Sequence, residues 1–250
     1  MTATTTAIRP AAAVAAPAAG APRFDMYASI HKALRHFMTD TLHRVGRMDV
    51  ADEADTARVL GQLDELLTLC VDHVHNENRH VHTAMEARQP GGAGRTAEEH
   101  VEHLESIEAL RAEAQALART PAAERSGPAL RLYRHVALFV AENLQHMHFE
   151  ETHNNAVLWS CYSDAELFEL HGRILAGLSL HETLLVARWM IPASTPAERA
   201  AIVGGMKAGA PAPVFAQVVD VIRPRLDEQA WDRLARAIGL PQQPGLVDFR

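Results

Sequence analysis

Two short segments of the sequence combine histidine and glutamate at a spacing that suits metal binding. The first reads DHVHNENRHVH and begins at Asp72; the second reads QHMHFEETH and begins at Gln145. In each segment a histidine precedes a glutamate by four residues, as His73–Glu77 and His146–Glu150. Residues at this spacing lie one turn apart on one helix face, so both side chains can reach one metal ion or two adjacent ions. Imidazole with carboxylate suits iron, manganese or zinc.

The other histidines of these segments take different directions on a regular helix. His75 and His148 lie about 200° around the axis from the preceding histidine, so they face away. His80 and His153 follow each glutamate by three residues and share its face. They are candidates for completing the coordination, or polar residues below the site or at the surface. One such pair arises often by chance, but two in equivalent places indicate a metal site rather than a solvated face.

The apolar pattern predicts that helices carry these residues throughout. Apolar residues recur at intervals of three and four, as at Ile30, Leu34 and Phe37, and no strand pattern is found. Turn-forming sequences occur at 46–55, 89–95, 119–128 and 161–164. We therefore expect an all-α protein with four long helices over about 24–160 and shorter helices at about 164–192, 196–208, 212–226 and 228–238.

Three capping boxes and the composition define the expected domains. The boxes are Thr96 with Glu99, Ser163 with Glu166 and Thr195 with Glu198. Residues 1–22, rich in Ala, Pro and Thr, are expected to be a disordered tail. Residues 23–162 are expected to form an up-and-down four-helix bundle, and residues 163–250 a helical C-terminal extension with no recognisable chemistry of its own.

The positions of the turns predict which histidines lie at the same height in such a bundle. The midpoint of His31 and His73 falls at position 52, that of His73 and His103 at 88, and that of His103 and His146 at 124.5. Each midpoint is in or beside an expected turn, so the four imidazoles should lie at one level, with Glu77 and Glu150 one turn away. His100 competes with His103 for the position on the third helix.

These motifs, in this order, resemble the hemerythrin-like family of non-haem diiron proteins, also called the HHE cation-binding domain. The resemblance covers about residues 24–160, through IHKALR, HVHNE, EHLESIEAL and HMHFEE. It implies a four-helix bundle with two irons, terminal imidazoles and bridging carboxylates. The implied ligands are His31, His73, Glu77, His103, His146 and Glu150.

The sequence departs from the oxygen-carrying hemerythrins, whose third helix contributes HxxxH. Here Ile107 follows His103 by four residues, so one histidine ligand is missing. Water, Glu151 or an imidazole from the tier below, His80 or His153, could take its place. The set resembles the carboxylate-rich hemerythrin domains of iron and oxygen sensing, which implies a protein that binds and reacts with dioxygen rather than one that stores it. Manganese or zinc in place of iron stays open.

Two alternatives concern what such a centre would serve. A diiron oxidase or oxygenase would need a cavity for a small-molecule substrate and a proton route, for which His80, His153, Tyr27 and Glu151 are candidates. A sensor would instead contact a protein partner through the helices of residues 163–240. A tunnel to the metal would favour the enzyme, and an exposed apolar patch on the C-terminal helices would favour the sensor.

Composition and charge limit the cellular setting. The 250-residue chain is 48% hydrophobic and 5% aromatic, with a formal net charge of -7 and dispersed arginines, so no nucleic-acid partner is predicted. No apolar run approaches the roughly 20 residues that span a bilayer, and the N-terminus lacks the features of a strong export signal. Cys70 and Cys161 form no CxxC pair, and reduced, buried thiols fit a cytoplasmic protein.

Overall fold

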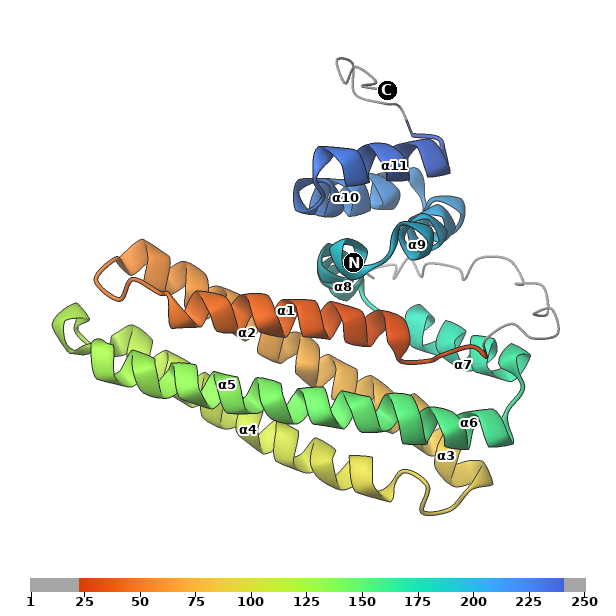
Figure 1. The fold of residues 1–250 in the computed structure, drawn as a ribbon, viewed down its shortest axis with the longest axis horizontal. Helices are drawn as coiled ribbons and strands as arrows, with labels where there is room; N and C mark the ends of the chain where they lie inside the picture. The colour runs from red at the N-terminus through yellow and green to blue at the C-terminus, as the bar shows by residue number, and fades with distance from the viewer. Residues whose placement is uncertain (1–22, 241–250) are drawn as a thin grey trace, which may run out of the picture. The chain divides into compact units, whose positions relative to one another are not determined.

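The computed structural model describes residues 23–240, and every regular element in this range is a helix (Figure 1). The all-α prediction is therefore confirmed for these residues. The tail predicted for residues 1–22 lies outside the described residues, as do the last ten. The chain divides into two compact units after Ile174, and each is described by itself.

The first unit is built on four long helices, and two of them each contain a π-helical segment. Their bounds are α1 (Ala28–Gly46), α2 (Glu53–Asn76) with η1 (Glu77–His82) and α3 (Thr83–Arg88), α4 (Gly94–Arg119), and α5 (Ser126–Phe149) with η3 (Glu150–Asn154) and α6 (Asn155–Cys161). A short 3₁₀ turn, η2 (Ala122–Glu124), precedes α5. Helix α1 packs against α2 and α5, and α4 packs against the same two helices, which closes a ring of four (Figure 1). We call this part the four-helix unit.

The helix ends agree with the expected turns, but one predicted helix cap is wrong. The first turn ends at Asp52, whose carboxylate accepts hydrogen bonds from the amides of Ala54 and Asp55 at 2.8 and 3.3 Å. Thr96 is not a cap, because α4 begins at Gly94 and the Thr96 hydroxyl donates to the carbonyl of Ala93. The prediction of a capping box at Thr96 is wrong.

The two π-helical segments begin at Glu77 and Glu150, the glutamates of the two His–Glu pairs. A π-helix has a wider turn than an α-helix, so it rotates every following residue around the axis. His82 and Asn154 are buried as a result, whereas His80 is half-buried and His153 is exposed. The predicted placement of His80 and His153 on the face of the glutamates is therefore wrong, because it assumed an uninterrupted α-helix.

An apolar cluster at the α3 and α6 end extends the four-helix unit to the next helix, α7 (Asp164–Gly177). Leu167 and Leu170 of α7 are buried there with Met85, Leu158 and other apolar residues. Each fully buried leucine stabilises the unit by about 1.5–3 kcal/mol. The division after Ile174 thus falls later than the boundary expected after residue 162, because α7 packs into this core.

The cap of α7 agrees with the sequence. The Glu166 carboxylate accepts from the Ser163 amide at 2.8 Å, and the Glu166 amide donates to the Ser163 hydroxyl at 3.4 Å. This reciprocal pair confirms the capping box at Ser163.

The second unit contains α8 (Leu180–Ala193), α9 (Pro196–Gly209), α10 (Ala212–Ile222), the 3₁₀ turn η4 (Arg223–Arg225) and α11 (Glu228–Ile238). Helix α10 packs on α8, and α11 packs on α9, around a core that includes Ile191, Val203, Ile222 and Trp231. The box of Thr195 is confirmed. A further box, Ser179 with Glu182, starts α8 and divides the single helix expected at 164–192.

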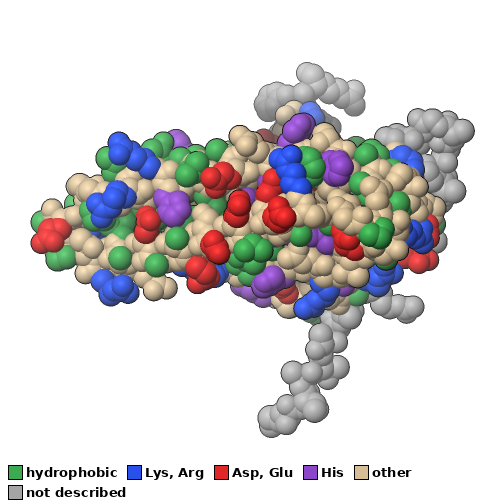
Figure 2. Space-filling model, turned by 90° about the horizontal axis from the view of Figure 1, so that it is seen from below, with side chains coloured by type: hydrophobic (Ala, Val, Ile, Leu, Met, Phe, Trp, Pro, Cys, Tyr) green, Lys and Arg blue, Asp and Glu red, His purple; other side chains and the backbone are tan. Residues whose placement is uncertain are grey.

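Charged side chains of both signs are interspersed on the surface, as the dispersed arginines of the sequence suggest. On the face drawn in Figure 2, Lys and Arg side chains are scattered and Asp and Glu side chains lie between them.

Among residues 23–240, no single helix has the length and apolarity to cross a bilayer; α7 and α8 reach that threshold only when counted together as a bent pair. Cys70 and Cys161 are both free, and Cys70 is buried.

Candidate metal centre

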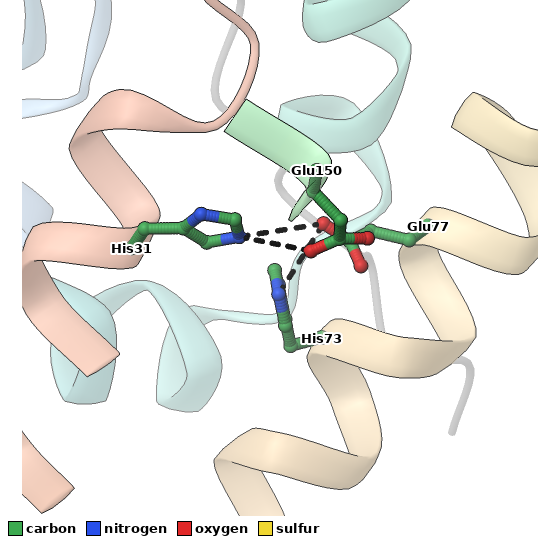
Figure 3. A group of neighbouring side chains, drawn as sticks. All are labelled: His31, His73, Glu77 and Glu150. Atoms are coloured by element: carbon green, nitrogen blue, oxygen red, sulfur yellow. Dashed lines mark ion pairs between the residues drawn. The ribbon is translucent and has the colours of Figure 1, made fainter. Parts of the chain in front are cut away.

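Four of the predicted ligands converge inside the four-helix unit. His31 from α1, His73 from α2, Glu77 at the start of η1 and Glu150 at the start of η3 point toward one another (Figure 3). One ligand atom from each lies within 4.8 Å of the others. The Nε2 atom of His31 is 3.4 Å from Glu150 Oε2, and Nε2 of His73 is 3.3 Å from Glu77 Oε1. Three residues of this group are buried, and His73 is nearly so.

A second group adjoins the first and shares both glutamates with it. It consists of Glu77, His100, His146 and Glu150, all buried, again with one ligand atom each within 4.8 Å of the others. The Nε2 atoms of His100 and His146 are 3.1 Å apart, and each lies 3.3 Å from a glutamate oxygen. Two imidazole pairs thus flank one pair of carboxylates, and each group offers donor atoms that could hold a metal ion.

Five inward atoms of this cluster lack a hydrogen-bond partner. These buried atoms are His31 Nε2, His73 Nε2, Glu77 Oε2, and both carboxylate oxygens of Glu150. A buried polar atom without a partner costs about 1–3 kcal/mol, and more when the group is charged. A metal ion would satisfy these atoms together. Their lack of partners is therefore better explained by a metal centre than by a purely structural polar cluster.

The third helix contributes His100 to this cluster, and His103 lies beside it. The ring of His103 meets the ring of His146 edge-on at 4.7 Å between centroids, and it also faces Phe139. His103 therefore belongs to neither four-residue group. The midpoint argument favours His103 on α4. In the structure His100 lies beside Asn78 and His82 of the second helix, so equal distance from the turn does not determine which α4 imidazole reaches the glutamates.

On the side away from the cluster, the imidazoles of His31 and His146 are each hydrogen-bonded to a glutamate that is paired with an arginine. The Nδ1 atom of His31 donates to Glu151 at 3.1 Å, and Arg35 donates to the same carboxylate at 2.9 Å. On the other side, Nδ1 of His146 donates to Glu99 at 2.7 Å, and Arg95 donates to Glu99 at 2.8 Å. Such contacts fix the ring orientation and keep Nε2 free for metal.

The other two imidazoles differ in their support. His100 Nδ1 donates to the amide oxygen of Asn78 at 2.8 Å. Among the described residues, no hydrogen bond holds His73. Glu151, predicted as a possible ligand, instead lies on the outer side of His31 and contacts Arg35.

The electrostatic balance leaves the glutamates ionised. Burial raises the pKa of Glu77, but His73, His100 and His31 outweigh it, and the net pKa is well below the usual value. Burial and the charge of Glu77 raise the pKa of Glu150, yet His146 and His31 bring it below the usual value. Two anionic carboxylates are the form in which metal binds.

The imidazoles divide between two protonation preferences. Burial lowers the pKa of His73 to about 4, so His73 is neutral and ready to coordinate. Burial also lowers the tendency of His31 and His146 to protonate, but their carboxylate neighbours raise both pKa values above the usual range. A metal ion bound there would take the place of those protons.

Tyr27, a candidate for the proton route, also lies near the cluster. Its ring is 5.2 Å from the ring of His31, and its buried hydroxyl has no hydrogen-bond partner. Burial, followed by the charges of Glu150 and Glu77, raises its pKa well above the usual value, so it is a neutral phenol. His75 and His148 are exposed, as the helix-face argument predicted.

A buried polar layer beneath the second group was missed by the sequence argument. The ring of His82 stacks on the ring of His100 at 4.8 Å between centroids. His82 Nε2 and Asn154 Nδ2 each lie 3.2 Å from the hydroxyl of Thr96. His82 and Asn154 reach this position only through the π-helical segments, which the sequence pattern does not reveal.

No family model matches the chain, and no curated protein or solved structure shows significant similarity to it. The relation to hemerythrin-like proteins therefore depends on the motifs and is taken forward as a proposal.

Proposed function

We propose that the chain is a hemerythrin-like, non-haem diiron protein that binds and reacts with dioxygen, in the sensing or handling of oxygen, iron or redox state. The observation that supports this most is the sharing of Glu77 and Glu150 by two buried histidine pairs. Sharing of this kind is what two adjacent ions require, whereas a single ion would need only one of the groups.

The proposal gives each residue a role. His31 and His73 would hold one iron, His100 and His146 the other, and Glu77 and Glu150 would lie between them. His103 is the alternative ligand on the third helix, as the motif order implies. Two iron ions held there would supply one electron each to dioxygen. Manganese and zinc suit the same donor atoms, so metal identity is part of the proposal.

The protein's own groups would shape this chemistry in two ways. The Arg35–Glu151 and Arg95–Glu99 pairs hold the imidazoles of His31 and His146 in place. The cluster itself lies in the interior, where Glu150 and His31 have no exposed surface. Exclusion of bulk water slows metal loss and confines the reaction to small molecules such as dioxygen.

The alternative of an oxidase or oxygenase receives less support. It needs a cavity that opens on the metal, and the pocket of about 360 Å³ in the four-helix unit is lined by none of the six predicted ligands. A sensing role would need a partner surface. The exposed large apolar side chains of the described residues lie mainly on α4 and α5, with Leu175 and Leu180 alone near the start of the second unit. A partner contact through the helices of residues 163–240 stays a prediction.

Stopped-flow absorption on iron-loaded protein, reduced without oxygen and mixed with aerated buffer, tests the proposed reaction. We expect rapid oxidation to a stable diferric form that does not return to the reduced state when oxygen is removed. Fewer imidazoles than in the oxygen carriers leave positions for water or carboxylate, which favour the ferric state. The His75→Ala variant serves as the matched control, because His75 is exposed. No absorption change would refute the proposed reaction, and a persistent, reversible oxygen adduct would replace it with a carrier role.

A further inference from the structure

A pocket separate from the metal cluster lies where η1 and α3 meet α7. It has a volume of about 360 Å³, within the range of roughly 300–1,000 Å³ common for small-ligand sites. Its wall includes Arg79 and His80 of η1, Arg88 of α3, and Arg173 of α7. All of these residues belong to the first unit.

The charged groups of this pocket do not cancel. Three arginines and two glutamates, Glu166 and Glu169, line it, which leaves an excess of one positive charge. Arg88 is already engaged by Glu166 and by the carbonyl of Cys161. Among the described residues, neither Arg79 nor Arg173 forms an ion pair. A positive pocket in a chain of net charge -7 is a local site for anions.

Both unpaired arginines act on the same imidazole. Burial lowers the pKa of His80, and the charges of Arg79 and then Arg173 lower it further. Arg79, His80 and Arg173 all line the pocket, and Arg173 comes from a different helix than the other two. The lowered pKa favours the neutral form of His80, which can donate a hydrogen bond without adding a charge.

Tyr162, Leu170 and Ala87 add apolar surface to the lining of the pocket. The guanidinium of Arg88 lies 3.8 Å from the centre of the Tyr162 ring, and the Tyr162 hydroxyl donates to the carbonyl of Ala84 at 2.7 Å. A ligand with an anionic end and a short non-polar part would therefore meet complementary surfaces at both ends.

We propose that this pocket binds a small carboxylate- or phosphate-bearing compound, with its anionic group on Arg79 and Arg173 and its non-polar part against Tyr162 and Leu170. Guanidinium groups bind both kinds of oxyanion by paired hydrogen bonds. Arg79 and His80 belong to the π-helical segment that begins at Glu77. Ligand binding would thus contact the segment that supplies a glutamate to the metal cluster.

Calorimetric titration of the full-length, metal-loaded protein with succinate and, separately, with sulfate tests the proposal. Both probes are weak ligands of metal ions, and the pair distinguishes a carboxylate site from a site for phosphate-like anions. The variants are Arg79→Gln and Arg173→Gln. Arg134→Gln is the control, because Arg134 is an exposed arginine of α5 and its loss changes the net charge equally.

We expect saturable binding of at least one probe, weakened about 10- to 100-fold in Arg79→Gln and Arg173→Gln, as expected for a lost hydrogen bond to a charged group. Arg134→Gln should keep the affinity of the original protein. Circular dichroism should show that all three variants are folded, since these side chains are exposed. Absence of saturable binding by either probe, or equal weakening in Arg134→Gln, would overturn the proposal. Binding that both pocket variants retain would also overturn it, because the probe would then be held elsewhere.

Discussion

The two halves of the candidate metal centre share their glutamates but differ in how their histidines are supported. The half with His31 and His73 has one imidazole held by an Arg–Glu pair, and no hydrogen bond holds the other among residues 23–240. In the half with His100 and His146, both outer nitrogens are bonded, and His82 stacks on His100. The second half is therefore the better organised, and we expect it to retain its metal longer.

The shared glutamates give the largest expected effect. Glu77→Ala or Glu150→Ala should remove most of the metal from both halves, because each carboxylate belongs to both groups. Loss of an anionic ligand also leaves two cations less shielded from each other. Metal content per chain, measured by elemental analysis, is the readout. Loss from one half only would show that the glutamate is not shared.

The third helix provides the next test. His100→Ala should empty the second half and leave about one metal ion per chain, since His100 is the α4 member of that group. His103→Ala should keep most of the metal, because the His103 ring packs on His146 from outside both groups. The opposite outcome would restore the ligand assignment made from the midpoints and place α4 in a different register.

The outer contacts should have intermediate effects that separate the halves. Glu151→Gln should lower the metal affinity of the first half, and Glu99→Gln that of the second, each by about 10- to 100-fold. Metal should therefore leave the affected half faster. The reason is that each glutamate orients one imidazole, that of His31 or that of His146. Metal release to a coloured chelator gives two phases if the halves differ. If both variants release metal as the original protein does, these contacts do not position the ligands.

Most of the fold could be predicted from local signals in the sequence. The turns at 46–55 and 119–128 and the caps at Ser163 and Thr195 depend on neighbouring residues, so they are visible in the sequence. The boundary was expected after residue 162, but the chain divides after Ile174. The reason is that Leu167 and Leu170 are buried by residues far away in the chain, which local signals do not show.

The site was predicted as far as the regular helices extend. His73, Glu77, His146 and Glu150 needed only the four-residue spacing, and they converge as expected. Beyond each glutamate the π-helical segment rotates the register, so His80 and His153 were expected inward where His82 and Asn154 are found. The apolar pattern of these segments is that of a regular helix and does not mark a π-helix. His100 rather than His103 belongs to the second group, and equal distance from a turn could not distinguish the two.

The smallest effect is expected on the outward face. His75→Ala and His148→Ala should leave metal content unchanged and shift the free energy of unfolding by no more than about 0.5 kcal/mol, because both side chains are exposed. Metal analysis and chemical denaturation measure the two quantities. A metal loss equal to that of Glu77→Ala would contradict the assignment of helix faces from which both halves are built.

The central claim is that one buried cluster holds two metal ions. The most direct test is elemental analysis of the full-length protein, purified without added metal, beside a Glu77→Ala/Glu150→Ala double variant that circular dichroism shows to be helical. The account predicts about two ions per chain, mainly iron, in the original protein. It predicts almost none in the double variant, because both shared carboxylates are gone. One ion or fewer in the original protein, or two ions retained by the double variant, would contradict the claim.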